Sequence, residues 1–496
     1  MKRLTTRTKP NTFSRNGTFP FFKRIRTTKH TPLLLGLGYL VVLCSIAIFI
    51  QRHRLLTQDP VPNNGRFPVQ PTRTITTTQT TKAQTRRTPT NLHHHVHTNN
   101  VNANNIGLPR AVVATNANRN RPPKAVIGYA VTITGCGDQI LIDGAAILSH
   151  SIHTNSYPTN PTSHYAYKLY AFVHPDALPC AVGLKELGYE VQERETAVVV
   201  ADIKGDFLRE NIHKVGCCGA AELIKLYAYT LVEHPVVVHV DCDVLILRPL
   251  DELFDAMLGD ADAGTDTGSA AKSTTIPYMF PAKVDPQTPI PAFFTRDYNL
   301  AYYGKKYPGI QGGFLVVRPN MAVFNDYIQI ITEGNFVKGS GWAGLGIGNF
   351  WGGRTIQGVV SYYYDHFHPR TAVELNRCLY NSMSDHAKPE CLKDDQKHTP
   401  KTTEDCEDCT ATNIEDIRTV HFTLCQKPWV CSNWKTNDLC QNMKERWFRM
   451  RRDWEMENLV DWKPPEGKLK PEIFHGYCKH ENKKGYLPID MTKLKP

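Results

Sequence analysis

The sequence predicts an α/β fold with a mostly parallel sheet flanked by helices, followed by a cysteine-rich C-terminal extension. Strand-like and helix-like patterns alternate through the first part of the folded region, and this alternation is typical of parallel sheets. The run from Val236 to Val240 is apolar on both faces apart from His239, as expected for a strand that helices cover on both sides.

The expected elements follow in chain order. Strands are expected at residues 125–134, 165–173, 189–192, 196–200, 236–240 and 311–319, and helices at residues 144–153, 220–233 and 321–332. Within the helix at 220–233, four apolar residues have the spacing expected of a buried helix face: Leu223, Leu226, Tyr227 and Leu231. Residues 259–308 are rich in Gly, Ala and Asp and then in Pro, so we interpret them as an insertion.

The first 122 residues differ sharply in charge from the rest. They hold 19 Lys/Arg and one acidic residue, Asp59, whereas the remaining residues hold 39 Lys/Arg and 46 Asp/Glu. The N-terminal part thus carries a charge of +18 and the rest −7, so the basic excess behind the net charge of +11 lies in the N-terminal part. Nucleic-acid binding by the folded part is disfavoured, because that part carries an excess of acidic groups.

An apolar run without a charged residue occupies positions 33–50. As a helix it would span about 27 Å, which suffices for a thin bilayer. Nine Lys/Arg and no acid precede it, so we expect a cytoplasmic tail at 1–32 and a type II anchor at 33–50. A cleaved signal peptide is the alternative, but Gln51 and Arg52 stand where small residues should precede a cleavage site.

Residues 51–122 are expected to form a disordered stem rich in Thr, Asn and Pro, because they cannot bury enough apolar surface to offset the entropy of ordering. The body would then face the lumen of the Golgi or endoplasmic reticulum. Eight of the 14 cysteines lie in the last third of the chain, which favours disulfides. Cys406 and Cys409 have the spacing of half a zinc site, but no matching second pair appears in the sequence.

Two aspartates, Asp241 and Asp243, follow the strand at 236–240 directly. In open α/β sheets ligands bind beyond the carboxyl ends of the strands, and two carboxylates placed there repel each other unless a cation lies between them. The pattern therefore favours a site for Mg²⁺ or Mn²⁺ that carries a substrate diphosphate. A surface turn with two solvated acids is the alternative.

A second polar motif combines His421 with Lys427, six residues later. A neutral imidazole can complete a metal site begun by two carboxylates, and a lysine can neutralise a diphosphate. Taken alone, His421 is also compatible with a structural role in the core.

Three further stretches leave alternatives open. Gly312 and Gly313, which begin a strand, permit close approach of a ligand to the backbone or simply form a turn. The aromatic and glycine-rich residues 341–364 suit sugar stacking as well as core packing. The basic residues within 443–454 are expected to form a solvated helix face, with a partner or membrane site as the alternative.

Two of these motifs resemble the glycogenin-like glycosyltransferases of family eight. The first is Asp241-Cys242-Asp243 with the Leu-Asp-Glu-Leu-Phe segment at 250–254, and the second is His421-Phe422 followed by Lys427-Pro428-Trp429. The resemblance covers roughly residues 125–258 and 309–430. It implies a Rossmann-like GT-A fold, Mn²⁺ (or Mg²⁺) as the cofactor, and a UDP-sugar donor whose anomeric configuration is retained.

The same resemblance implies a role for each matching residue. The metal ligands would be Asp241, Asp243 and His421. The residues expected in catalysis are Lys225, on the helix before the Asp-x-Asp motif, Gln311, which lines the sugar pocket, and Gln357. Substrate would be bound by Thr132 and Thr134 at the base, Cys242 at the ribose, Lys427 at the diphosphate, and Gly312 and Gly313.

The chain also departs from the family pattern. Ile356 stands where the family has an aspartate before the glutamine, and Leu424 stands where it has a glycine that contacts phosphate. The insertion at 259–308 and the cysteine-rich segment at 378–420 have no glycogenin counterpart. With the expected anchor, these features imply a catalytic domain at 123–430, an extension at 431–496, and a luminal glycan or glycoprotein acceptor.

These observations lead to one main hypothesis and two alternatives. The main hypothesis is a metal-dependent retaining glycosyltransferase that transfers a hexose or related sugar. The alternatives are a catalytically silent carbohydrate-binding or scaffold protein, and a transferase with another donor such as a GDP-sugar. Asp365 and Glu374 are carboxylates near the expected site, but the sequence does not identify either as a nucleophile.

Overall fold

The structure is a computed structural model. It describes residues 122–136, 141–214, 216, 218–259, 289–298, 308–386, 407–431, 437–463, 477–478 and 485–495. The expected tail, apolar run and stem lie outside these residues, apart from Pro122. Within the described ranges, no helix combines the length and the apolar character needed to cross a membrane.

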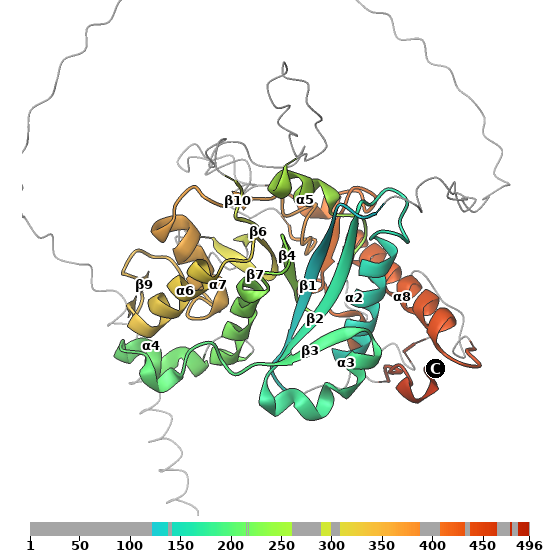
Figure 1. The fold of residues 1–496 in the computed structure, drawn as a ribbon, viewed down its shortest axis with the longest axis horizontal. Helices are drawn as coiled ribbons and strands as arrows, with labels where there is room; N and C mark the ends of the chain where they lie inside the picture. The colour runs from blue at the N-terminus through green and yellow to red at the C-terminus, as the bar shows by residue number, and fades with distance from the viewer. Residues whose placement is uncertain are drawn as a thin grey trace, which may run out of the picture. The chain divides into compact units, whose positions relative to one another are not determined.

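A seven-stranded sheet forms the centre of the described fold (Figure 1). Its strands lie in the order β10-β6-β7-β4-β1-β2-β3. In this sheet β7 runs antiparallel to both of its neighbours, and the other strand pairs are parallel. The prediction of a mostly parallel sheet flanked by helices is therefore confirmed. The strands are β1 Ala125–Ile133, β2 Tyr165–Val173, β3 Tyr189–Glu193, β4 Val237–Val240, β6 Ala292–Asp297, β7 Gly309–Val317 and β10 Val373–Glu374.

Two smaller sheets and a set of helices complete the described part of the chain. The smaller sheets pair β5 (Val244–Ile246) with β11 (Thr419–His421), and β8 (Phe336–Val337) with β9 (Gly341–Trp342). The α-helices are α2 Leu141–Thr154, α3 Val182–Glu186, α4 Asp206–Asn211, α5 Asp251–Leu258, α6 Met321–Glu333, α7 Ile356–Tyr362 and α8 Asp438–Asn458. Short 3₁₀ helices are η2 Pro175–Cys180, η3 Val200–Asp202, η4 Ile212–Lys214, η10 Cys409–Ala411, η11 Pro428–Val430 and η12 Met491–Lys493; η5 Gly219–Thr230 is a longer one, and η7 Tyr363–Phe367 is a π-helix.

Apolar side chains cover both faces of the central sheet. Along β1, Ile127, Tyr129 and Val131 face the core that includes α2 and α5, whereas Ala130 faces the core that includes α6 and α7. Figure 1 shows α2 on one side of the sheet and α6 and α7 on the other. This two-sided burial explains why the strand residues are apolar at successive positions.

Two expected elements differ from the structure. Residues 196–200 do not form a strand: the Val199 side chain is 61% exposed, and the chain enters the 3₁₀ helix η3 instead. The helix expected at 220–233 is the 3₁₀ helix η5. In η5 the buried side chains Leu223, Leu226 and Tyr229 recur every third residue, which matches three residues per turn.

The segment interpreted as an insertion contains a core strand. Residues 292–297 form β6, which pairs with β7 and β10 inside the central sheet. All six β6 residues are buried, including Arg296. Arg296 donates hydrogen bonds to Asp365 (2.7 and 3.0 Å) and to Glu374 (2.8 Å), so its charge is balanced in the interior. The flanking prolines and the buried arginine concealed this strand in the sequence.

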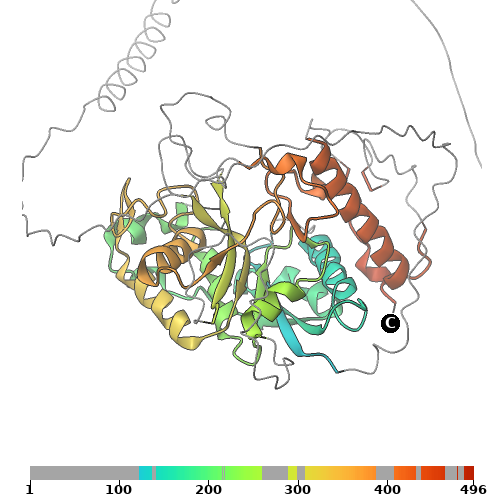
Figure 2. The same ribbon diagram turned by 90° about the horizontal axis from the view of Figure 1, so that it is seen from above.

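The C-terminal helix α8 lies against α2 (Figure 2). The expectation of a wholly solvated basic face is wrong for Lys444 and Arg451, which are both buried. Arg451 donates to Glu455 (2.9 and 3.0 Å) and lies 3.4 Å from Asp143 in the first turn of α2. Burial raises the pKa of the Asp143 carboxyl, whereas Arg451 favours its ionised form. Arg451 thus joins the extension to α2.

Four disulfides lie among the described residues: Cys136–Cys180, Cys378–Cys409, Cys425–Cys440 and Cys431–Cys478. Because Cys409 is bonded to Cys378, the zinc alternative for Cys406 and Cys409 is not supported. Cys242 is buried with a free thiol.

Replacing Arg451 should destabilise the fold strongly. Arg451→Met leaves the buried carboxylates of Asp143 and Glu455 without a cation, which should lower the free energy of unfolding by about 3–5 kcal/mol. Chemical denaturation measures this loss. Arg449→Met, at an exposed position on the same helix, is the control. Equal losses for the two variants would contradict a stabilising role for the buried cluster.

Candidate active site

The Asp-x-Asp motif forms the connection between β4 and β5. β4 ends at Val240 and β5 begins at Val244. The Asp241 N–H donates to the Gly313 carbonyl on β7 (3.1 Å), and the Val244 N–H donates to the Asp241 carbonyl (3.0 Å). These bonds hold both aspartates at the carboxyl end of a parallel strand, where the sequence places them.

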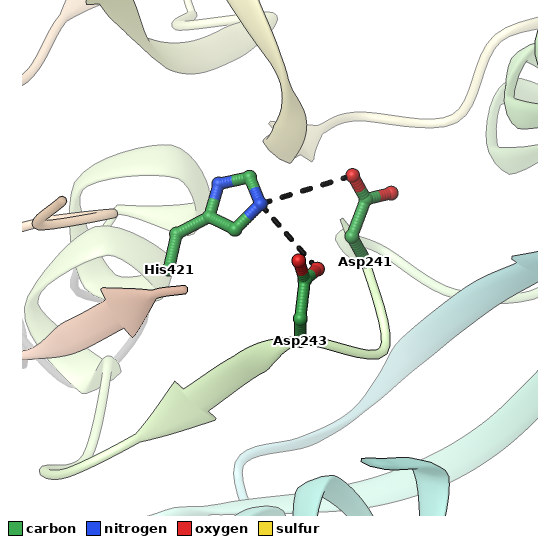
Figure 3. Close-up of side chains that lie close together, drawn as sticks. All are labelled: Asp241, Asp243 and His421. Carbon is green, nitrogen blue, oxygen red and sulfur yellow. Dashed lines mark ion pairs between the residues drawn. The ribbon is translucent and has the colours of Figure 1, made fainter. Parts of the chain in front are cut away.

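His421 reaches the aspartates because β11 pairs with β5. In the antiparallel register His421 lies opposite Val244, and the Phe422 N–H donates to the Asp243 carbonyl (3.0 Å). The imidazole Nε2 is 3.4 Å from Asp243 Oδ1 and 4.0 Å from Asp241 Oδ2 (Figure 3). One donor atom from each of the three side chains lies within 4.8 Å of the others. The structure thus brings the three predicted metal ligands together.

The glycine pair is required by this close packing. A Cβ atom on Gly313 would lie 2.4 Å from His421 Cε1 and 2.8 Å from Asp241 Oδ2. A Cβ atom on Gly312 would lie 2.8 Å from Ile356 Cγ2. Protein side chains thus lie directly against both glycines, and the approach of a ligand to their backbone stays a prediction.

Each aspartate is paired with a lysine. Lys225 Nζ on η5 donates to Asp241 Oδ1 (2.6 Å) and to the Gly312 carbonyl (3.2 Å), and Lys427 Nζ donates to Asp243 Oδ2. Burial alone would raise the pKa of the Asp243 carboxyl, but His421 and Lys427 hold it well below its usual value. Burial alone would lower the pKa of Lys225, but Asp241 raises it above its ordinary value. Both groups are therefore charged at neutral pH.

The chemistry of the three side chains fits a hard divalent cation. Two carboxylate oxygens and one imidazole nitrogen suit Mn²⁺ or Mg²⁺. Cys242 is not suited to act as a further ligand, because burial raises the pKa of its thiol to about 12 and the thiolate form is disfavoured. A divalent cation would lie between Asp241 and Asp243, whose carboxylates repel each other unless positive charge is nearby.

The twelve side chains and glycines selected from the sequence line one cavity of about 430 Å³. They are Thr132, Thr134, Lys225, Asp241, Cys242, Asp243, Gln311, Gly312, Gly313, Gln357, His421 and Lys427. Their proximity is a finding, whereas their individual roles in binding and catalysis stay predictions. The Thr132 hydroxyl lies 2.8 Å from His239 Nε2, and burial lowers the pKa of His239 to about 3, so this ring is neutral.

Several cavity residues were not selected from the sequence, notably Glu222, Asp297 and Trp351. Asp297 ends β6 and was hidden in the presumed insertion. Glu222 precedes Lys225 by three residues on η5, a spacing that puts both side chains on one face and that could have revealed it. The carboxylates of Asp365 and Glu374 are bound to Arg296, and neither side chain lines this cavity.

The two residues that depart from the family pattern, Ile356 and Leu424, have different surroundings. Ile356 lines the cavity and packs beside Gly312, whereas Leu424 is exposed and does not line it. The segment that carries Lys427 is fixed on both sides by disulfides, Cys425–Cys440 and Cys431–Cys478. The extension therefore constrains the position of Lys427.

Comparisons with known proteins give structural neighbours only. No family model matches the chain, and no curated protein matches its sequence. The bifunctional glycosyltransferase WbbM has 11% identity and a TM-score of 0.37, with 67% of this chain and 51% of WbbM covered, so the chain spans about half of that protein. Mouse xyloside xylosyltransferase 1 has 13% identity, a TM-score of 0.34, and coverages of 60% and 96%.

A third neighbour is the galactosyltransferase LgtC, solved with donor and acceptor sugar analogues. It has 10% identity and a TM-score of 0.34, with 66% of this chain and 95% of LgtC covered. Similarity at this level does not assign an activity. The class of protein is therefore proposed from the site itself.

Gly313→Ala should weaken metal binding. The added methyl group would displace His421 or Asp241, so the affinity for Mn²⁺, measured by electron paramagnetic resonance, should fall at least about tenfold. Gly183→Ala is the control, because its Cβ would make only ordinary contacts, at 3.6 Å or more. Unchanged Mn²⁺ affinity in Gly313→Ala would show that these side chains do not form the metal site.

Proposed function

We propose that this protein is a metal-dependent retaining glycosyltransferase that moves a hexose or related sugar from a UDP-sugar to a luminal glycan or glycoprotein acceptor. The observation that carries the proposal is the convergence of two aspartates, a histidine and two lysines in one cavity. Lys427 and Asp243 are 184 residues apart in the chain, so this convergence is a product of the fold.

The charges of the site support binding of a nucleotide diphosphate. Asp241, Asp243 and His421 would hold Mn²⁺ or Mg²⁺, and the bound metal would stabilise the charge on the departing diphosphate. Each aspartate is already balanced by one lysine. A divalent cation and a doubly charged diphosphate would together add no net charge, so the complete site would remain balanced.

The two lysines differ in their freedom to move. The Lys225 side chain is 12% exposed and is held by both Asp241 and the Gly312 carbonyl. The Lys427 side chain is 45% exposed, so its ammonium can turn from Asp243 to an arriving diphosphate. Lys427 would then stabilise the leaving group, while Lys225 would hold Asp241 in place.

Polar side chains beside the metal ligands would bind the donor sugar. Gln311, Gln357 and Asp297 line the cavity and can exchange hydrogen bonds with sugar hydroxyls. The base and ribose would lie toward Thr132, Thr134 and Cys242, as the resemblance implies. Together these residues would orient the donor with its anomeric carbon next to the diphosphate.

Transfer would exchange one bond at the anomeric carbon for another. The acceptor hydroxyl oxygen forms a bond to C1 as the bond from C1 to the β-phosphate oxygen breaks, and UDP leaves with that electron pair. The hydroxyl proton passes to the departing diphosphate and then to water. Because Arg296 binds both Asp365 and Glu374, neither is available as a nucleophile, and attack from the face of the leaving group is the route we propose.

The compartment is also part of the proposal. Four disulfides among the described residues support an oxidising environment, such as the lumen of the Golgi or endoplasmic reticulum. A type II anchor at residues 33–50 would place the body there. The competing function, a silent carbohydrate-binding or scaffold protein, is motivated by Ile356 and Leu424, of which only Ile356 lines the cavity.

Removing one metal ligand should abolish turnover. Asp243→Ala should lower Mn²⁺-dependent hydrolysis of UDP-sugars by at least about 100-fold, since it removes a ligand of the ion that stabilises the leaving group. The released nucleoside diphosphate is measured, as UDP with a panel of UDP-sugars and as GDP with a parallel panel of GDP-sugars. The exposed Asp202→Ala is the control. Turnover of no donor by the unaltered chain would favour the silent binding protein.

A further inference from the structure

One large apolar side chain at the cavity is left in contact with solvent. Trp351 is 59% exposed and lines the cavity that holds the metal-ligand cluster. Among the described residues it alone combines a large exposed apolar side chain with a place in this cavity. Single exposed apolar residues are common on protein surfaces, so its position at the site is the informative feature.

The backbone on both sides of Trp351 is held in place. A Cβ atom on Gly309 would lie 2.1 Å from the Phe350 ring, so this ring packs directly on the start of β7. On the other side, Thr355 Oγ1 lies 2.9 Å from the Gly352 carbonyl and 2.6 Å from Glu222 Oε2. The Trp351 ring is therefore exposed on an anchored turn.

Contacts also place Trp351 relative to the metal ligands. Gly313 touches His421, Gly312 packs beside Gln357, and a Cβ atom on Gly352 would lie 2.3 Å from Gln357 Oε1. Gln357 therefore lies between Gly312, next to the metal ligands, and Gly352, next to Trp351. Lys427 lies against Asp243, and its Nζ is 5.8 Å from the centroid of the Trp429 ring.

The polar groups nearest to Trp351 are an amide and a carboxylate: Gln357 lies against Gly352, and Glu222 accepts a hydrogen bond from Thr355, which also donates to the Gly352 carbonyl. Gln357, Asp297 and Glu222 share the cavity with Trp351. A pyranose ring has an apolar C–H face and an edge of hydroxyl groups, which an aromatic face and carboxylate or amide oxygens can bind together. The Glu222 carboxylate beside this turn disfavours a negatively charged ligand, whereas Lys225 in the same cavity is already paired with Asp241.

We propose that Trp351 is the stacking surface for the acceptor, and that the acceptor is the neutral terminal sugar of a glycoside. This inference rests on the proposed function. In the proposed function Asp241, Asp243 and His421 would hold the metal that binds the donor diphosphate, whereas the acceptor would enter from solvent. Trp351 offers the exposed apolar surface just beyond Gln357, where the transferred sugar would end.

The test compares Trp351→Ala, Trp351→Phe and Leu345→Ala in the full-length chain. Leu345 is also exposed, at 49%, but does not line the cavity, so it is the matched control. The probes are the methyl glycosides of glucose, galactose, mannose, xylose and N-acetylglucosamine, with a Ser/Thr peptide for comparison. The readouts are the KM for each probe and the Kd for UDP with Mn²⁺.

We expect Trp351→Ala to raise the KM of the preferred glycoside at least about tenfold. Trp351→Phe should restore most of the affinity, and the Kd for UDP should not change. An unchanged KM in Trp351→Ala overturns the proposal. A weakened Kd for UDP, or transfer to the peptide alone, also overturns it.

A binding measurement separates this inference from the proposed function. The chain is labelled with 5-fluorotryptophan, and Trp351→Phe identifies the Trp351 fluorine signal. A glycoside that shifts this signal without any turnover supports the sugar-binding surface and refutes the transferase. Turnover with no shift of this signal supports the transferase and refutes the role of Trp351.

Discussion

The site depends on the pairing of β5 with β11. This short antiparallel contact sets His421 opposite Val244, so an imidazole from late in the chain faces both carboxylates of the β4–β5 connection. The contact is possible only because β7 presents Gly313 at the point of closest approach, where a single methyl group would collide with His421 and Asp241. Three segments must therefore fold together before the site exists.

Electrostatic balance makes this packing tolerable. Two aspartates, one of them buried, would repel each other in an apolar interior, but each is bound by a lysine from a different element. Lys225 approaches from η5 and is nearly enclosed, whereas Lys427 approaches from a partly exposed segment. The same pairing leaves one nearly enclosed cation, Lys225, and one partly exposed cation, Lys427; in the proposed function only the exposed one would turn to the diphosphate.

The C-terminal extension is part of this arrangement. Disulfides at Cys425 and Cys431 bracket Lys427 and join its segment to α8 and to Cys478. Arg451 on α8 in turn meets Asp143 in the first turn of α2, close to Leu141, which lines the cavity. The extension is thus connected to the Lys427 segment by disulfides and to the first turn of α2 by Arg451, so we expect its stability to affect the geometry of the site.

The sequence by itself determined the parallel α/β sheet, the Asp-x-Asp turn after a buried strand, and the His421–Lys427 motif, because periodicity, burial and residue chemistry are local properties. It missed β6, whose flanking prolines and buried Arg296 conceal a core strand, and it treated Lys444 and Arg451 as solvated. Only the tertiary structure decided that His421 faces Asp241 and Asp243, that Glu222 and Asp297 share their cavity, and that Trp351 stays exposed beside it. These outcomes depend on contacts between distant segments, and no local pattern states which distant segment becomes the partner.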